Sequence, residues 1–263
     1  MKNARRPSRR LCLTLDLEND YGRFDRYQCF SGLDILETLI KKFKIRLTTF
    51  VTGKVLEDRP EVVERLQKLG SEFGLHSYSH TVSRSLSIPE RLEEIKLAVQ
   101  AYQSYFGEMP LAYRAPQGMI FPEEIEALSQ MGFKIDASLF PSFRPGLFDN
   151  RGAPTESFQY ENGLREIPFA VVPKIRLPIA LSYMQFFGWH SYRLWFRLFG
   201  LPESIVYDFH MHNLKPTEDV HKLPLSLRLF YSRNHDKGAK ILEKFLKFMF
   251  DQDYKSVYLS ELI

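Results

Sequence analysis

His76 and His80 lie four residues apart in the segment GLHSYSH (Gly74–His80). If this segment formed a helical turn, residues i and i+4 would project from the same face, and the two imidazoles could bind one metal ion. Two exposed histidines in a polar turn would explain the same spacing without any function. The spacing alone is therefore only a hypothesis for a metal site, and a third ligand must come from another part of the chain.

The apolar segment LCLTLDL (Leu11–Leu17) is typical of a β-strand and ends in acidic residues. Strand alternation places Thr14, Asp16 and Glu18 on one face. Two acids on a shared face repel each other unless a cation or a proton lies between them, although solvated acids in a loop beyond the strand are the simpler explanation. Asp20 continues the same alternation and is a spare candidate ligand.

Glu18, His76 and His80 together would supply a carboxylate and two imidazoles. Three protein ligands with an open fourth position are typical of a catalytic zinc site rather than a structural one. Asp16, next to this group, could accept a proton from a water molecule.

Further polar residues follow other predicted strands. Arg114, in YRAPQG (Tyr113–Gly118), could pair with Asp16 and keep it ionised, although a lone arginine more often forms a surface salt bridge. Asp136 lies at the end of the strand in KIDASLFPS, with Ser138 two residues further on.

The segment VYDFHMHNL contains a second histidine pair. Alternation places Asp208, His210 and His212 on one face, and a histidine on the far side of the metal could protonate a leaving group. A core or surface histidine without a function explains this segment about equally well.

Short apolar segments alternate with amphipathic helices along the chain, which predicts an α/β fold with a parallel sheet and crossover helices. At 263 residues, a regular or distorted β/α barrel is the natural closure of such a sheet, with its chemistry at the carboxyl ends of the strands. We expect helices over 32–43, 59–70, 88–107, 121–132 and 236–252, strands near 11–17, 46–53, 71–77, 111–116, 133–139, 204–212 and 255–262, and irregular structure from about 140 to 204.

Composition indicates one domain over residues 11–263, preceded by a basic arm at residues 1–10. The net charge of +4 is small, and no nucleic-acid-binding motif is present. The N-terminal segment reaches a charged residue too early for a secretory signal, and two cysteines do not form a disulfide framework. We therefore expect a cytoplasmic protein, and the sequence does not predict its oligomeric state.

The segment Phe169–Gly200 is rich in aromatic residues with interspersed lysine and arginine. It is either a core-packing insertion or a lid or membrane-surface patch, since aromatic residues beside cations suit the bilayer interface. The second interpretation would make the cytoplasmic protein membrane-associated.

Taken together, these motifs resemble the polysaccharide deacetylases, the NodB-homology or carbohydrate esterase family 4 group. The resemblance runs from about Leu11 to His212 and rests on five motifs in family order: TLDLE, HSYSH, RAPQG, GFKIDAS and FHMHNL. TLDLE is the less common D-x-E variant of the first motif. In the last motif, Met211 stands where the family often has proline, and Asn213 stands where it has an acidic residue.

The resemblance implies a distorted (β/α)7 barrel with one divalent metal ion, with Zn2+ favoured and Co2+ or Ni2+ as alternatives. It implies that Glu18, His76 and His80 are the metal ligands. It also implies catalytic roles for four residues: Asp16 as general base, Arg114 as the group that orients it, His210 as general acid, and Asp136. His212 remains an alternative to His210.

The activity that the resemblance implies is hydrolysis of an N-acyl group, most simply N-acetyl, from a sugar of a polysaccharide or a lipid-linked glycan. One alternative is an amidohydrolase that acts on a small C–N compound outside the glycans, because a fold does not fix a function. Another is a binding module that has lost its activity, although Asp16 and His210 argue against it.

Overall fold

The computed structural model describes residues 9–81 and 85–263. Its main sheet contains β1 (Arg10–Leu17), β2 (Leu47–Val51), β3 (Glu72–Leu75), β4 (Ala112–Tyr113), β5 (Ile135–Asp136), β8 (Phe158–Gln159), β9 (Arg165–Glu166), β12 (Ser204–His210) and β13 (Lys255–Ser256). Two hairpins lie outside it, β6 (Phe143–Arg144) with β7 (Phe148–Asp149) and β10 (Val171–Val172) with β11 (Leu177–Pro178).

The α-helices are α1 (Leu33–Phe43), α2 (Gly53–Asp58), α3 (Pro60–Lys68), α4 (Ile88–Phe106), α5 (Pro122–Met131), α6 (Leu181–Phe187), α7 (Trp189–Phe199), α8 (Met211–Leu214), α9 (Leu225–Ser232) and α10 (Gly238–Asp251). Short 3-10 helices include η1 (Gln28–Gly32) and η6 (Leu259–Leu262).

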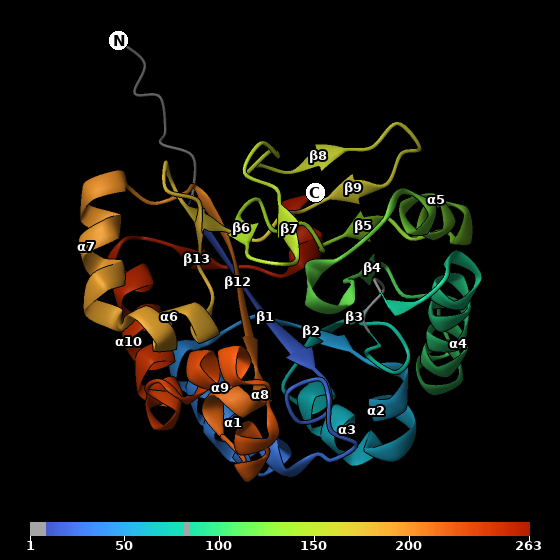
Figure 1. Cartoon of the computed structure of the whole chain (residues 1–263), viewed down its shortest axis with the longest axis horizontal. Helices are drawn as coiled ribbons and strands as arrows, with labels where there is room; N and C mark the ends of the chain where they lie inside the picture. Colours follow the sequence, from blue (N-terminus) through green and yellow to red (C-terminus); the bar gives the residue numbers. More distant parts are fainter. Residues whose placement is uncertain (1–8, 82–84) are drawn as a thin grey trace.

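The strand order is β12-β1-β2-β3-β4-β5-β9-β8, and every neighbouring pair from β12 to β9 is parallel. The sheet curls into an open barrel with helices around its outside (Figure 1). This confirms the predicted distorted (β/α)7 barrel. Because parallel strands present their carboxyl ends at one edge, all the loops that follow them meet at the same end of the barrel.

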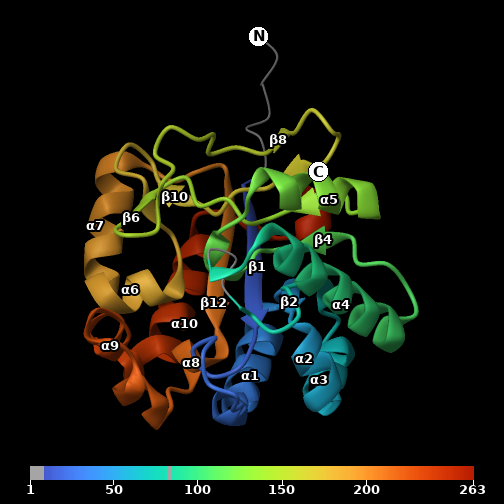
Figure 2. The same ribbon diagram turned by 45° about the vertical axis from the view of Figure 1, so that its right-hand side comes forward.

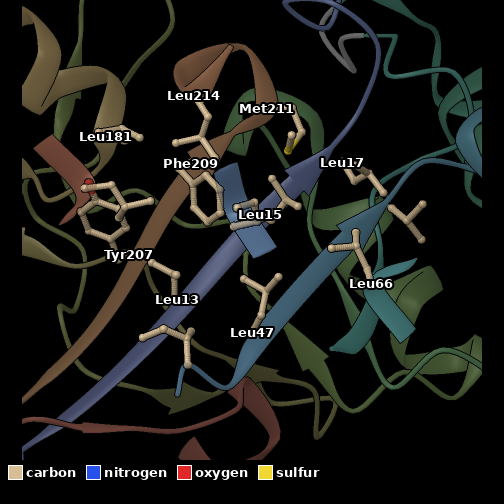
Figure 3. Packing of buried hydrophobic residues seen from close by; sticks show 14 of the residues in the cluster. Leu13, Leu15, Leu17, Leu47, Leu66, Leu181, Tyr207, Phe209, Met211 and Leu214 are labelled. Atoms are coloured by element: carbon tan, nitrogen blue, oxygen red, sulfur yellow. The ribbon is translucent and has the colours of Figure 1, made fainter. Parts of the chain in front are cut away.

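Alternation along β1 separates the two sides of the sheet. Leu13, Leu15 and Leu17 are buried and belong to the large core between the sheet and the surrounding helices, where they lie near Tyr207 and Phe209 of β12 (Figure 3). The opposite set of β1 side chains therefore faces the barrel interior, and it contains the polar residues expected at the site.

The floor of the barrel is an apolar layer. Its members come from most strands and from the C-terminal 3-10 helix, and they are Cys12, Phe50, Ala112, Ile135, Ala137, Ile167, Val206, Leu259 and Leu262. Burying this layer excludes water from one end of the barrel, so the polar groups above it interact in a dry environment.

Several parts of the chain differ from the prediction: α2 and α9 were not expected, and the strand expected near 255–262 is β13 followed by the 3-10 helix η6. The region expected to be irregular contains α6 and α7, because Trp189, Tyr192 and Phe196 recur at helical spacing and are buried together. The last interior strand ends at His210, two residues early, because α8 begins at Met211.

At the N-terminus, residues 1–8 of the predicted basic arm lie outside the described residues. Arg9 and Arg10 belong to the fold: Arg9 donates a hydrogen bond to the Gln252 carbonyl, and Arg10 begins β1 and donates to Ser204 Oγ. Within the described ranges, no helix combines the length and the apolar character needed to cross a membrane.

Gly238, the first residue of α10, makes the closest approach of any glycine to a neighbouring backbone. A Cβ atom there would lie 1.7 Å from the carbonyl oxygen of Asn213 in α8. We expect Gly238→Ala to lower the free energy of unfolding by about 3 kcal/mol, because the two helices must separate. Urea denaturation measures this change.

Gly152→Ala is the matched control, since a Cβ at Gly152 meets no atom within 4 Å. Equal stabilities of the two variants would show that α8 and α10 do not pack as described.

Candidate active site

The polar side chains expected at the site meet at the carboxyl ends of the strands. Asp16 of β1 is the register partner of His210 at the end of β12. His76 follows β3, and Arg114 follows β4. Strands that neighbour one another in the sheet therefore bring together residues that lie up to 194 positions apart in the sequence.

Glu18, His76 and His80 form one compact group, and all three are buried. Glu18 Oε2 lies 3.4 Å from His76 Nε2 and 2.5 Å from His80 Nε2. Although burial alone would raise the pKa of Glu18, the neighbouring imidazoles of His80, His210 and His76 hold it well below its ordinary value. The carboxylate is therefore ionised.

Backbone carbonyls fix the orientation of both imidazoles. His76 Nδ1 lies 2.8 Å from the Arg114 carbonyl oxygen, and His80 Nδ1 lies 3.0 Å from the Gly22 carbonyl oxygen. A carbonyl only accepts a hydrogen bond, so each Nδ1 must carry the proton, and each Nε2 faces Glu18. This is the arrangement that orients metal-binding histidines in known sites.

The two histidines do not lie on a helix. Residues 76–80 form a turn in which Ser77 (φ 63°) and His80 (φ 61°) adopt the left-handed conformation. This turn, rather than an i, i+4 helical face, brings the rings to a centroid distance of 5.0 Å. Such a conformation is uncommon for residues other than glycine and is often found at functional sites.

Gly22 shapes the rim of this group. It has a φ of +61°, and a Cβ atom there would lie 2.4 Å from His80 Cε1 and 2.9 Å from Glu18 Oε1. Only glycine allows the backbone to approach His80 closely enough to accept its Nδ1 proton.

Asp16 is held by Arg114, as predicted from the sequence. Arg114 Nη1 donates to Asp16 Oδ1 at 2.7 Å and to Thr14 Oγ1 at 2.9 Å, and the guanidinium lies between the rings of Phe50 and Phe169. Burial alone would raise the pKa of Asp16, but Arg114 and the nearby imidazoles lower it. Asp16 is thus an ionised carboxylate with a fixed orientation.

His210 lies beside these carboxylates, at the end of the neighbouring strand β12. Its Nε2 lies 3.7 Å from Asp16 Oδ2 and 3.8 Å from Glu18 Oε1, and its Nδ1 lies 3.8 Å from Asp208 Oδ2. Burial disfavours the charged ring, but the carboxylates of Asp208, Glu18 and Asp16 outweigh it and raise the pKa of His210. The imidazole is therefore stabilised in its protonated form.

Asp208 is a member of this group to which the sequence did not assign a role. It accepts a hydrogen bond from Arg114 Nη1 at 3.2 Å, and burial together with the charge of Asp16 raises its pKa to about 6. The sequence could have indicated a role for Asp208, because it lies two residues before His210 and therefore on the same face of that strand.

His212 and Asp20 do not face the carboxylates, although the His212 ring stacks on His210 at a centroid distance of 4.9 Å. His212 belongs to α8 and packs on the rings of Tyr21 and Tyr231, and burial followed by the charge of His210 lowers its pKa well below the ordinary value. The Asp20 carboxylate accepts hydrogen bonds from the backbone nitrogens of Gln28 and Cys29, so it anchors the loop before η1 rather than facing the histidines.

Asp136, expected among the catalytic residues, points away from the barrel interior. Its neighbours Ile135 and Ala137 belong to the interior layer, so alternation turns Asp136 to the other face of β5. There it is the register partner of Glu166 in β9, and Ser138 Oγ donates to it at 2.5 Å. Ser138 also accepts a hydrogen bond from the backbone nitrogen of Ala115, beside Arg114. Asp136 thus supports the loop that carries Arg114 and does not face Asp16.

The residues of the first group fit a metal ion. Glu18 Oε2 and His76 Nε2 are buried and have no hydrogen-bond partner among the described residues. Three buried carboxylates, Asp16, Glu18 and Asp208, also lie in this site, and Arg114 pairs with Asp16 and Asp208 only, so Glu18 has no permanent positive charge beside it. A divalent cation between one carboxylate and two imidazoles would satisfy both features.

The Asp136–Glu166 pair makes stability depend on pH. Burial and the adjacent Asp136 carboxylate raise the pKa of Glu166 well above its ordinary value, so the folded protein retains a proton that the unfolded chain has released. The contribution of Glu166 is complete below its ordinary pKa and is lost as pH rises through the folded-state pKa. The amide of Glu166→Gln needs no proton. We therefore expect the free energy of unfolding of this variant, relative to that of wild type, to increase by about 1.4 kcal/mol per pH unit above pH 5.

Urea denaturation of both proteins between pH 5 and pH 8 measures this difference. Glu123→Gln, an exposed carboxylate of α5, is the control and should follow wild type. Parallel profiles for wild type and Glu166→Gln would contradict a shared proton in this pair.

Comparison with known proteins agrees with this geometry. Residues 25–135 match the family model described as polysaccharide deacetylase. The chain is 37% identical over 106 residues to the peptidoglycan-N-acetylmuramic acid deacetylase PdaC of Bacillus subtilis, a match that covers 40% of this chain and 21% of the relative. It is 29% identical over 108 residues to a peptidoglycan deacetylase of Helicobacter pylori, which covers 41% of this chain and 37% of the relative.

Solved structures extend the likeness to nearly the whole chain. The structure of PdaC from Bacillus subtilis superimposes with a TM-score of 0.55 at 18% identity, covering 97% of this chain and 90% of that chain. The allantoinase PuuE superimposes with a TM-score of 0.63 at 13% identity, covering 97% and 89%. At these identities the likeness concerns the fold alone. The match to the polysaccharide deacetylase family model thus covers residues 25–135, and the fold of nearly the whole chain is similar to that of solved deacetylases.

Proposed function

We propose that this protein is a metal-dependent hydrolase that removes an N-acyl group, most simply N-acetyl, from an amino sugar of a glycan. The observation that carries the proposal is the placement of Asp16 and His210 beside the Glu18–His76–His80 group, at the carboxyl ends of the strands. The peptidoglycan deacetylases to which the chain is similar support an acetylated glycan as substrate.

Glu18, His76 and His80 would hold the metal ion, for which zinc is the first candidate and cobalt or nickel are alternatives. A divalent ion at this position supplies Lewis acidity toward the acyl group and favours ionisation of a water molecule. The two imidazoles would offer their Nε2 atoms to the ion because their Nδ1 atoms are engaged by backbone carbonyls.

Asp16 is suited to receive a proton from the attacking water. Arg114 keeps it ionised and fixes one carboxylate oxygen, and the other, Oδ2, faces His76 and His210. His210 has the opposite role: the surrounding carboxylates keep it protonated, so it can donate a proton to the departing amine. Asp16 thus accepts a proton and His210 donates one within the same site.

A second candidate is an amidohydrolase of a small C–N compound. The fold neighbour described as an allantoinase favours testing it, because it superimposes as well on this chain as the deacetylases do. The same proton-transfer groups would serve either reaction, so the substrate decides between them.

Metal content is the first test. We expect about one divalent ion per chain in the wild type by mass spectrometry, and its loss in the double variant His76→Ala/His80→Ala, because two of three protein ligands are removed. His190→Ala, which changes an exposed histidine of α7, should retain the ion. Equal metal content in all three proteins would contradict the proposal. So would a wild type that contains no metal and gains no activity when zinc, cobalt or nickel is added.

The two histidines of the last motif provide the second test. With chito-oligosaccharides and N-acetylated peptidoglycan fragments as substrates, we expect Asp16→Asn and His210→Asn to lower kcat by about 100- to 10,000-fold with the metal retained. His212→Asn should have a smaller effect, since the His212 ring stacks on His210 and packs on two tyrosines but makes no contact with the carboxylates. Released acetate and free amine measure the reaction.

Allantoin serves as the substrate for the second candidate in the same assay. Hydrolysis of allantoin without turnover of any acetylated glycan would replace the proposed function. A loss in His212→Asn as large as in His210→Asn would overturn the assignment of the proton donor.

A further inference from the structure

The outer surface of α6, α7 and α9 combines exposed leucines with unpaired arginines. The three helices follow one another along the same side of the molecule in both views (Figures 1 and 2). Among residues 9–81 and 85–263, the large apolar side chains that are more than half exposed, apart from Ile263, all lie here, at Leu194 and Leu198 of α7 and Leu225 and Leu229 of α9. We call this surface the α7/α9 face.

The exposed leucines of each helix lie on one side of that helix. Leu194 and Leu198 are separated by four residues on α7, as Leu225 and Leu229 are on α9, so each pair occupies one helical face. The opposite side of α7 is buried through Trp189, Tyr192 and Phe196, whereas α9 has no buried residue. The leucines are therefore a second apolar stripe that the fold itself does not cover.

The charges on this face all have one sign. Residues 181–202 and 220–235 contain five lysines or arginines and no aspartate or glutamate, although the whole chain is nearly balanced at 36 basic and 32 acidic residues. Arg193, Arg197 and Arg228 are exposed and have no ion-pair partner within residues 9–81 and 85–263. Exposed leucines flanked by unpaired cations are complementary to an anionic bilayer surface, which takes up apolar side chains and attracts basic ones.

The face is connected to the active site by contacting rings. Neighbouring centroids lie 4.9–5.2 Å apart in the order Phe187, Phe186, Phe230, Tyr231, His212 and His210. Phe187 is exposed at the end of α6, and His210 is the proton donor proposed above. A series of five ring contacts therefore links α6 and α9 to the wall of the site.

We propose that the α7/α9 face docks the protein onto the surface of an anionic lipid bilayer. The membrane-surface patch that the sequence predicted at 169–200 is thereby limited to α6 and α7, and α9 is added to it. Most of the apolar residues from Phe169 to Ala180 are instead buried in the core. Combined with the proposed function, on which this last step rests, docking would present the site to an acylated amino sugar attached to a membrane lipid.

The test is binding of the full chain to sucrose-loaded vesicles, measured by sedimentation without any substrate. Wild type should bind vesicles containing phosphatidylglycerol at least tenfold more strongly than vesicles of phosphatidylcholine alone, and this preference should weaken in high salt because the charges are screened. Leu194→Gln/Leu198→Gln/Leu225→Gln/Leu229→Gln should lower binding at least tenfold. Arg193→Gln/Arg197→Gln/Arg228→Gln should abolish the preference for phosphatidylglycerol.

Ile88→Gln/Leu97→Gln/Leu111→Gln is the matched control, because these exposed apolar residues lie outside the face. It should bind as wild type does, and circular dichroism should show all four proteins folded to the same extent. Since the assay contains no substrate, failure of the proposed hydrolysis would not change the result.

Three results would overturn the proposal. They are no wild-type binding to either vesicle, equal loss in the control variant, and a concentration-dependent dimer in wild type that the leucine variant lacks. The last result would identify the face as a contact between two copies of the chain.

Discussion

The buried side chain of Arg114 holds the site together. Its guanidinium binds carboxylates from two strands, Asp16 of β1 and Asp208 of β12, and its Nε donates to the Ala137 carbonyl. Its own carbonyl accepts the Nδ1 proton of His76. Burying a guanidinium is costly unless it is paired and hydrogen bonded, so the positions of β1, β4 and β12 are fixed relative to one another by one residue.

The environment of Arg114 explains why this pairing is stable. Phe50 and Phe169 stack on the two sides of the guanidinium, at 4.1 and 4.2 Å from their ring centroids, and exclude water. Below them, the apolar floor is closed by Leu259 and Leu262 of the C-terminal 3-10 helix. In such a dry layer, an ion pair is strong and an unpaired charge is costly. The excess carboxylates above Arg114 therefore need protons or a cation, and this requirement is the physical basis of the candidate metal site.

Asp16 and Asp136 both lie at strand ends, but their protonation states differ because their side chains face opposite sides of the sheet. Asp16 faces the interior, where Arg114 lowers its pKa and keeps it charged. Asp136 faces outward, where Glu166 lies beside it and the pair keeps a proton. Alternation along each strand thus separates a reactive carboxylate from a structural one, although both follow an apolar strand in the sequence.

The sequence by itself determined the strands β1 to β5 and β12, the helices α1, α3, α4, α5 and α10, and the motifs that carry Asp16, Glu18, His76, His80, Arg114 and His210. These follow from local periodicity and from residue types at strand ends. It could not determine which face Asp136 uses, because its short strand shows no clear alternation, or that His76 and His80 lie on a turn. The pairing of Arg114 with Asp208, the packing of His212 against tyrosines and the packing of α6 against α9 depend on segments far apart in the chain. Only the tertiary structure decided them, because it sets which surfaces are buried together.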